Sequence, residues 1–93
     1  MIRSFGDSET ESIYNGIKSK KLPPEIQNIA RRKLRMISAA KVIEDLRIPP
    51  GNRLEKLVGD ISEFYSVRIN SQWIIIFKFE DGGADNVRIK DYH

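Results

Sequence analysis

The spacing of apolar residues changes at a loop near the middle of this 93-residue chain. Before residues 48–52, apolar side chains recur with the helical period of about 3.6, and after this loop they alternate with the period of about 2 that strands show. Pro49 and Pro50 lack the backbone N–H that a helix interior needs, so no helix crosses the loop. The chain therefore predicts helices in its first half and strands in its second half, as in an α+β domain.

Two helices are predicted in the first half. Ser8 and Glu11 have the spacing of a capping box, which predicts a helix over residues 9–20 with Gly16 inside it. Pro24 suits the first position of a second helix, which we expect to end near Leu46. The predicted buried face of this second helix is formed by Ile26, Ile29, Ala30, Met36, Ile37, Ala40 and Ile43.

One charged side chain, Lys33, falls inside this apolar arc. We expect its methylenes to pack against the core while the ammonium reaches solvent. The other basic residues of the segment 31–35 are interpreted as a solvated helix face.

A short strand is predicted over residues 2–5, and four more over residues 53–58, 63–69, 72–79 and 84–90. Their short connections predict an antiparallel meander. A three-residue hairpin loop at residues 70–72 would pair Ile69 with Trp73, Val67 with Ile75 and Tyr65 with Phe77. The opposite face would then carry Ser66, Arg68, Ile74, Ile76 and Lys78, with Arg88, Lys90 and Tyr92 from the last strand.

These elements predict one domain over residues 1–93, with the two N-terminal helices packed on one face of an antiparallel sheet and the other face open and partly basic. The formal net charge of +3 favours polyanionic partners. The absence of cysteine excludes disulfides and thiolate metal sites, and a single histidine leaves little for a zinc site. The longest apolar run, residues 73–77, is far short of the ~20 residues of a membrane span, and no signal-peptide core is present, so we expect a cytoplasmic protein.

The chain ends with three proton-handling side chains, Asp91, Tyr92 and His93. Histidine can accept or donate a proton near neutral pH, and Arg88 and Lys90 lie close enough in sequence to bind an anion. These groups can act together only if the preceding strand holds the tail against the sheet. Strict alternation would send Asp91 and His93 to the face opposite Tyr92, so convergence requires the strand to twist or end there.

Several segments carry a resemblance to a known family: residues 1–5, 49–57, 59–60, 66–70 and 72–73, and the closing triple at 91–93. Together they resemble the HigB-type toxins of the RelE/ParE toxin–antitoxin superfamily. The resemblance covers nearly the whole chain. It implies a RelE-like fold and a ribosome-dependent endoribonuclease, or mRNA interferase, which uses neither a metal nor another cofactor.

In such a reaction the RNA 2′-hydroxyl attacks the adjacent phosphate, so the enzyme must remove one proton, stabilise the added negative charge and protonate the leaving 5′-oxygen. By motif position, the resemblance assigns proton transfer to Asp91, Tyr92 and His93, with His93 as acid or base and Tyr92 stacking on a base or supplying its hydroxyl. The candidate substrate-binding cations are Arg68, Lys56 and Arg88.

The chain departs from the family pattern at Ile74, where many relatives have an arginine that can contact the scissile phosphate. It also has Glu55 and Val58 where some relatives carry a histidine and a lysine. Loss of one charge-stabilising group lowers a rate by about 10² to 10³. Two alternatives therefore stay open, a ParE-like toxin that acts on DNA gyrase and a weakly catalytic or non-catalytic module that acts in an antitoxin complex.

The resemblance also implies partners. They are a HigA-like helix-turn-helix antitoxin, the ribosome with its mRNA, and operator DNA reached only through the antitoxin; no membrane partner is expected.

Overall fold

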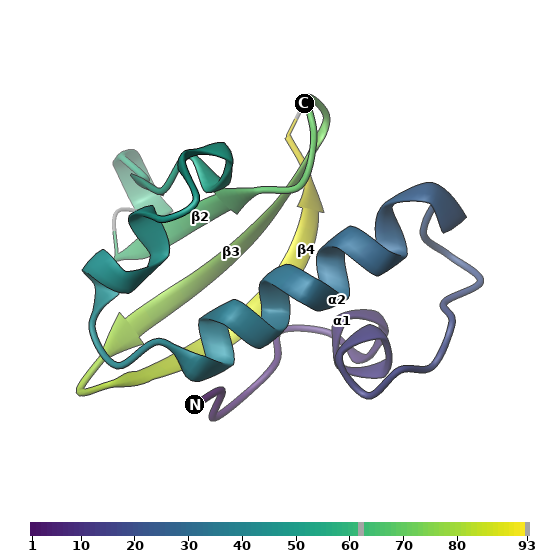
Figure 1. Ribbon diagram of the computed structural model, residues 1–93, viewed down its shortest axis with the longest axis horizontal. Helices are drawn as coiled ribbons and strands as arrows, with labels where there is room; N and C mark the ends of the chain where they lie inside the picture. Colours follow the sequence, from purple (N-terminus) through teal and green to yellow (C-terminus); the bar gives the residue numbers. More distant parts are fainter. Residues whose placement is uncertain (62, 93) are drawn as a thin grey trace.

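A computed structural model describes residues 1–61 and 63–92 of the chain. Both helices lie on one side of a four-stranded antiparallel sheet (Figure 1), which confirms the predicted α+β architecture. Within the described residues no helix has the length and apolar character needed to cross a bilayer. The helices are α1 (Ser8–Tyr14) and α2 (Pro24–Ala39), the strands are β1 (Glu55–Lys56), β2 (Phe64–Arg68), β3 (Trp73–Glu80) and β4 (Gly83–Asp91), and 3-10 turns span Ile43–Arg47, Pro50–Asn52 and Gly59–Ile61.

The strands follow one another in the sheet in chain order, β1-β2-β3-β4, so the predicted meander is confirmed. The hairpin between β2 and β3 has the predicted register, with Tyr65 opposite Phe77 and Val67 opposite Ile75. The side-chain oxygen of Asn70 accepts hydrogen bonds from the backbone N–H groups of Gln72 and Trp73, both at 2.8 Å. This side chain therefore shapes the three-residue turn that sets the register.

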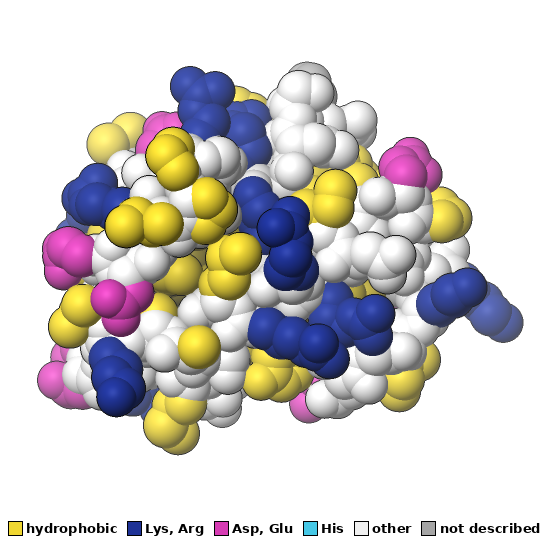
Figure 2. Space-filling model, in the orientation of Figure 1, with side chains coloured by type: hydrophobic (Ala, Val, Ile, Leu, Met, Phe, Trp, Pro, Cys, Tyr) yellow, Lys and Arg dark blue, Asp and Glu magenta, His cyan; other side chains and the backbone are white. Residues whose placement is uncertain are grey.

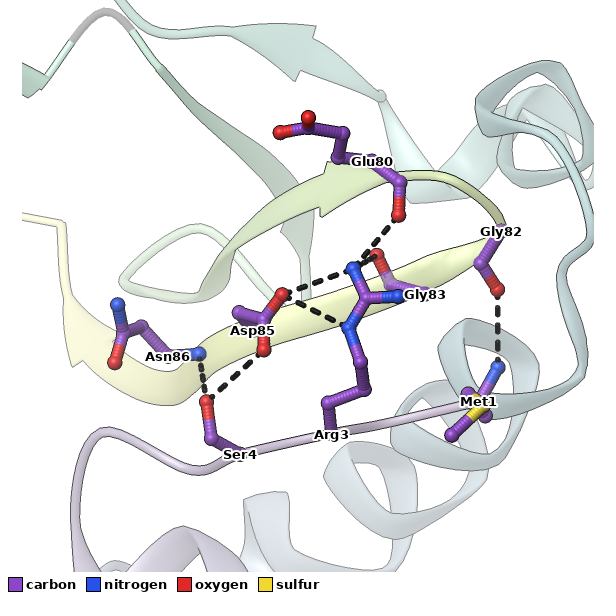
Figure 3. A network of polar contacts seen from close by, with 8 residues as sticks. All are labelled: Met1, Arg3, Ser4, Glu80, Gly82, Gly83, Asp85 and Asn86. Carbon is purple, nitrogen blue, oxygen red and sulfur yellow. Dashed lines mark hydrogen bonds and ion pairs between the residues drawn. The ribbon is translucent and has the colours of Figure 1, made fainter.

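The N-terminal segment, where a short strand is predicted, forms isolated parallel bridges to β4 from Ile2 and Phe5 instead of a strand. The Arg3 guanidinium fixes this segment, because it pairs with Asp85 at 3.0 Å and donates to the Glu80 carbonyl at 2.7 Å (Figure 3). A Cβ on Gly83 would collide with the same guanidinium. The start of the chain is thus joined to the β3–β4 hairpin.

The first helix is shorter than predicted and is capped by a different residue. Asp7 is its N-cap and accepts from the backbone N–H of Thr10 at 2.8 Å, so Ser8 lies inside the helix. The helix ends at Tyr14, and Gly16 adopts a φ of +85°, a left-handed conformation that glycine tolerates best. The Ile17 N–H then donates to the Ser12 carbonyl, which closes a Schellman-type helix end. Gly16 was therefore wrongly placed inside the helix.

The second helix begins at Pro24 as predicted but ends at Ala39, well before Leu46. The chain turns away because the Asp45 carboxylate accepts hydrogen bonds from the Lys41 and Val42 N–H groups and starts a separate 3-10 turn. These backbone hydrogen bonds lower the pKa of the Asp45 carboxyl below its ordinary value.

The core lies between α2 and the facing side of the sheet. Ile26, Ala30 and Ile37 are buried as predicted, but Ile29 is 36% exposed and Leu34 is fully buried in its place. The sheet contributes Val67, Ile75, Phe77, Val87 and Ile89 to the same cluster. The apolar arc is therefore rotated slightly about the helix axis relative to the prediction.

The prediction for Lys33 was wrong. Its side chain is buried, and its ammonium donates to the backbone carbonyl of Arg68 at the end of β2. Burial lowers the pKa of the Lys33 ammonium below its ordinary value of 10.5, and the positive charge of Arg32 lowers it further. Other basic side chains of α2 remain at the surface, where Figure 2 shows Lys and Arg gathered across the helix side of the molecule.

A second buried polar contact joins α1 to the sheet. The hydroxyl oxygen of Thr10, which is fully buried, accepts a hydrogen bond of 2.9 Å from the backbone N–H of Ile89 in β4. Buried backbone donors almost always have a partner, and here a helix side chain supplies it.

We expect Thr10→Val to lower the free energy of unfolding by about 1–3 kcal/mol, because the substitution keeps the shape but leaves the buried Ile89 N–H without an acceptor. Urea denaturation measures this change. Thr10→Ser keeps the hydroxyl and serves as the control. An unfolding free energy for the valine variant equal to that of the wild type would contradict the assigned hydrogen bond.

The lowered pKa of Lys33 predicts a pH-dependent stability difference from Lys33→Met. Between the lowered pKa of Lys33 in the folded protein and the ordinary value of 10.5, this lysine is protonated in the unfolded chain but has lost its proton in the folded protein. The free energy of unfolding therefore rises with pH over this range. The methionine variant lacks this contribution. We therefore expect wild type to gain stability relative to the variant as pH rises from neutral towards 10.5, measured by urea unfolding at several pH values. A difference independent of pH would refute the assigned shift.

Candidate nucleic-acid interface on the second face of the sheet

The side of the sheet away from α2, called here the second face, carries a row of three side chains from neighbouring strands. Arg68 lies opposite Ile74, and Ile74 lies opposite Lys90. Directly opposite residues in an antiparallel sheet share a face, so two cations flank one apolar residue. The next row contains Ser66, Ile76 and Arg88 in the same way.

This face is not fully open, which corrects the prediction. Ile74 and Ile76 are 5% and 1% exposed although they point away from the main core. The segment that follows β1 is drawn fainter in Figure 1 and so lies farther from the viewer than α2. Its Leu57 and Ile61 line one pocket together with Ile74 and Ile76. A pocket of about 140 Å³ remains between the segment and the sheet, lined by Leu57, Ile61, Ile74, Ile76, Lys90, Asp91 and Tyr92.

The end of β4 is held by the turn of the β2–β3 hairpin. The Tyr92 N–H donates to the Gln72 carbonyl at 2.6 Å, and the Gln72 side-chain amide donates to the Asp91 carboxylate at 3.0 Å. The tail is thus attached to the sheet at least as far as Tyr92.

The Arg68 side chain connects this turn to the tail. Its guanidinium lies 4.7 Å from the centre of the Tyr92 ring, a cation–π distance, and donates weakly to the carbonyls of Asn70 and Ser71 at 3.3 and 3.4 Å. On the opposite side of the sheet, Lys33 binds the Arg68 carbonyl. Side chain and backbone of Arg68 are therefore both held in place.

The described structure brings together four of the predicted site features: Arg68, Tyr92 and Asp91 meet at the hairpin turn, and Lys90 adds a cation beside them. His93, the last residue of the closing triple, lies outside the described residues. The ion pairs seen among residues 1–61 and 63–92 involve neither Arg68 nor Lys90.

Two predicted cations lie apart from this group. Lys56 pairs with Tyr65, and Tyr65 pairs with Phe77 in the main core, so Lys56 lies on the helix side of the sheet. Its ammonium is 5.3 Å from the centre of the Tyr65 ring. Arg88 lies on the second face, but its side chain packs over Gly6 in the N-terminal segment.

The sequence analysis missed Leu57 and Ile61, which line the pocket. Leu57 falls inside the predicted strand over residues 53–58, where an apolar side chain gives no sign of a pocket, and Ile61 is a single apolar residue directly after the Gly-Asp turn. Within the described part of the chain, no cluster of three or more His, Cys, Asp or Glu residues could hold a metal ion.

The chain is similar to known toxins in sequence and in structure. The family model described as the RelE-like toxin of the type II toxin–antitoxin system HigB matches residues 3–93. Toxin HigB-1 of Vibrio cholerae serotype O1 is 42% identical over 87 residues, which is 92% of each chain. An uncharacterised protein of Haemophilus influenzae is 42% identical over 84 residues, which cover 89% of this chain and 83% of that protein.

Solved structures share the fold at low sequence identity. YafQ of Escherichia coli superimposes with a TM-score of 0.64 at 9% identity, covering 99% of this chain and 94% of YafQ. A chain of the YoeB–YefM complex of Staphylococcus aureus gives 0.63 at 15% identity, covering 100% of this chain and 98% of that chain. The family match spans almost the whole sequence and the fold agrees with it. This chain therefore belongs to the HigB-like family of RelE-like toxins of type II toxin–antitoxin systems.

Proposed function

We propose that this toxin is a ribosome-dependent endoribonuclease that cuts messenger RNA by metal-independent transfer of the phosphate to the 2′-hydroxyl. The observation that carries the proposal is the attachment of the C-terminal tail to the β2–β3 turn beside Arg68. A tail held in this way can present titratable groups to a bound phosphodiester. Membership of the family of RelE-like toxins supports this proposal.

Each group has a role set by its chemistry. Arg68 is permanently charged and lies beside Tyr92, so it stabilises the negative charge that develops on the phosphate. Tyr92 is 52% exposed and offers a ring for stacking on a base or a hydroxyl for hydrogen bonding. His93 follows directly in sequence and acts as acid or base, while the Asp91 carboxylate orients the groups around it.

The proposed partner is a HigA-like antitoxin that neutralises the toxin. The YoeB–YefM structures, which share this fold, are toxin–antitoxin complexes. The ribosome would supply the mRNA, and operator DNA would be reached through the antitoxin alone.

His93→Gln is expected to lower mRNA cleavage by about 10² to 10⁴, the usual contribution of a positioned acid or base. The assay incubates purified toxin with translating ribosomes and maps the 5′ ends of the messenger. Intact messenger with wild-type toxin, together with damaged DNA, would instead support the gyrase-directed alternative. Intact messenger and intact DNA would support a non-catalytic module.

Arg68→Gln is expected to lower the cleavage rate by about 10² to 10³, because the negative charge that develops on the phosphate would no longer be stabilised by the Arg68 guanidinium. Lys56→Gln is the matched control, since Lys56 lies on the other side of the sheet, and we expect it to change the rate by less than about fivefold. Equal losses in the two variants would show that the second face does not hold the scissile phosphate.

A further inference from the structure

The Lys33 side chain connects α2 to the end of β2, the strand that carries Arg68. Lys33 is 7% exposed, and its helix neighbours Ala30 and Ile37 are fully buried in the core. This part of α2 is therefore a fixed support. From it the Lys33 ammonium reaches the backbone carbonyl of Arg68, 35 residues further along the chain.

The Arg68 carbonyl depends on this lysine because strand pairing stops before it. The Ile69 N–H donates to the Trp73 carbonyl, so alternation along the antiparallel pair turns the backbone groups of Arg68 away from β3 and towards the β1 side. In the described part of the chain, β1 pairs with β2 only as far as Ser66. The Lys33 ammonium thus binds a carbonyl that a longer β1 would otherwise pair with.

The guanidinium of Arg68 has only weak polar contacts of its own. Its hydrogen bonds to the carbonyls of Asn70 and Ser71 are long, and its Nε is buried with no hydrogen-bond partner among the described residues. Its contact with the Tyr92 ring requires the guanidinium to lie over that ring. The position of the guanidinium therefore depends on the backbone that carries it, and Lys33 holds this backbone.

Stability alone does not explain a lysine at this position. Burial of an ammonium is costly, and replacement of buried charged groups by apolar side chains of similar volume is often neutral or stabilising. Burial also lowers the pKa of Lys33, as is common at functional positions. The cost of burying this charge is accounted for if the ammonium places Arg68.

We propose that Lys33 is a positioning residue for the candidate site: its ammonium holds the end of β2 so that the Arg68 guanidinium stays beside Tyr92. Lys33 itself touches no substrate, because it is buried between α2 and the sheet. The inference rests on the proposed function, since it names the group that orients the cation of that site. Misplacement of such a group by about 1 Å lowers a rate by about 10².

Lys33→Met removes the ammonium and keeps most of the side-chain volume. We expect kcat for messenger cleavage on ribosomes to fall by about 10- to 100-fold and KM to change by less than about threefold, because Lys33 affects geometry and not binding. Arg35→Met is the matched control, since Arg35 is an exposed cation on the same helix, and we expect its kcat to stay within about twofold of wild type. A kcat for Lys33→Met equal to that of wild type, or an equal loss in Arg35→Met, would overturn the proposal.

A double-mutant cycle shows whether Lys33 acts through Arg68. In an Arg68→Gln background the guanidinium is absent, so we expect Lys33→Met to lower the remaining rate by less than about twofold. A loss as large as the one in the wild-type background would show that Lys33 acts by another route, and the proposal would fail.

Nuclear magnetic resonance of the free toxin tests the geometry without any cleavage. The Tyr92 ring, 4.7 Å from the Arg68 guanidinium, shifts the side-chain resonances of this arginine. We expect Lys33→Met to move these resonances towards their values in Tyr92→Leu, which lacks the ring, and Arg35→Met to leave them unchanged. Unchanged Arg68 resonances in a folded Lys33→Met protein would contradict the positioning role.

The outcomes separate this inference from the nuclease proposal. If wild-type toxin leaves messenger intact, the nuclease proposal fails, and the Arg68 resonances still decide whether Lys33 positions the guanidinium. If wild type cuts messenger and Lys33→Met changes neither the rate nor the resonances, the positioning role alone fails. Urea unfolding establishes whether Lys33→Met is folded, and Lys33→Leu replaces it if it is not. Failure of both variants to fold would show that the lysine serves stability, which would also reject the positioning role.

Discussion

The Asn70 side chain in the β2–β3 turn controls much of this structure. Its oxygen accepts two backbone hydrogen bonds and thereby shapes a three-residue loop, which fixes the register of the two central strands. A slip by one residue would exchange the two faces of a strand. With the observed register, Val67, Ile75 and Phe77 face the helices, while Arg68 and Ile74 face the other way. The same turn then receives the C-terminal tail through Gln72.

The helices do more than cover the core, because two of their polar side chains bind the backbone of the sheet. Thr10 accepts from the Ile89 N–H, and Lys33 donates to the Arg68 carbonyl. Both contacts are buried, so each would be costly to leave unmade. The Thr10 contact holds the strand that leads into the tail, and the Lys33 contact holds the end of β2 that carries the Arg68 guanidinium. The scaffold thus fixes the candidate site from behind.

Membership of a toxin family does not by itself establish how this chain acts on RNA. Its second face combines Arg68 and Lys90 with an apolar floor at Ile74 and Ile76. Electrostatic binding of the backbone positions a strand, and contacts with bases select sequence. The sequence resemblance predicts a charged residue at position 74, and this chain has isoleucine there.

The sequence alone determined the order of elements, the antiparallel meander, the β2–β3 register and the face on which Arg68 lies, because these follow from local periodicity and turn chemistry. It also placed Pro24 at the start of α2. Long-range contacts decided the rest. The ammonium of Lys33 binds a backbone carbonyl 35 residues away, strand pairing places Lys56 on the helix side, and Leu57 and Ile61 from the segment after β1 line a pocket with Ile74. Periodicity specifies which residues share a face, but only the packed chain specifies what covers that face.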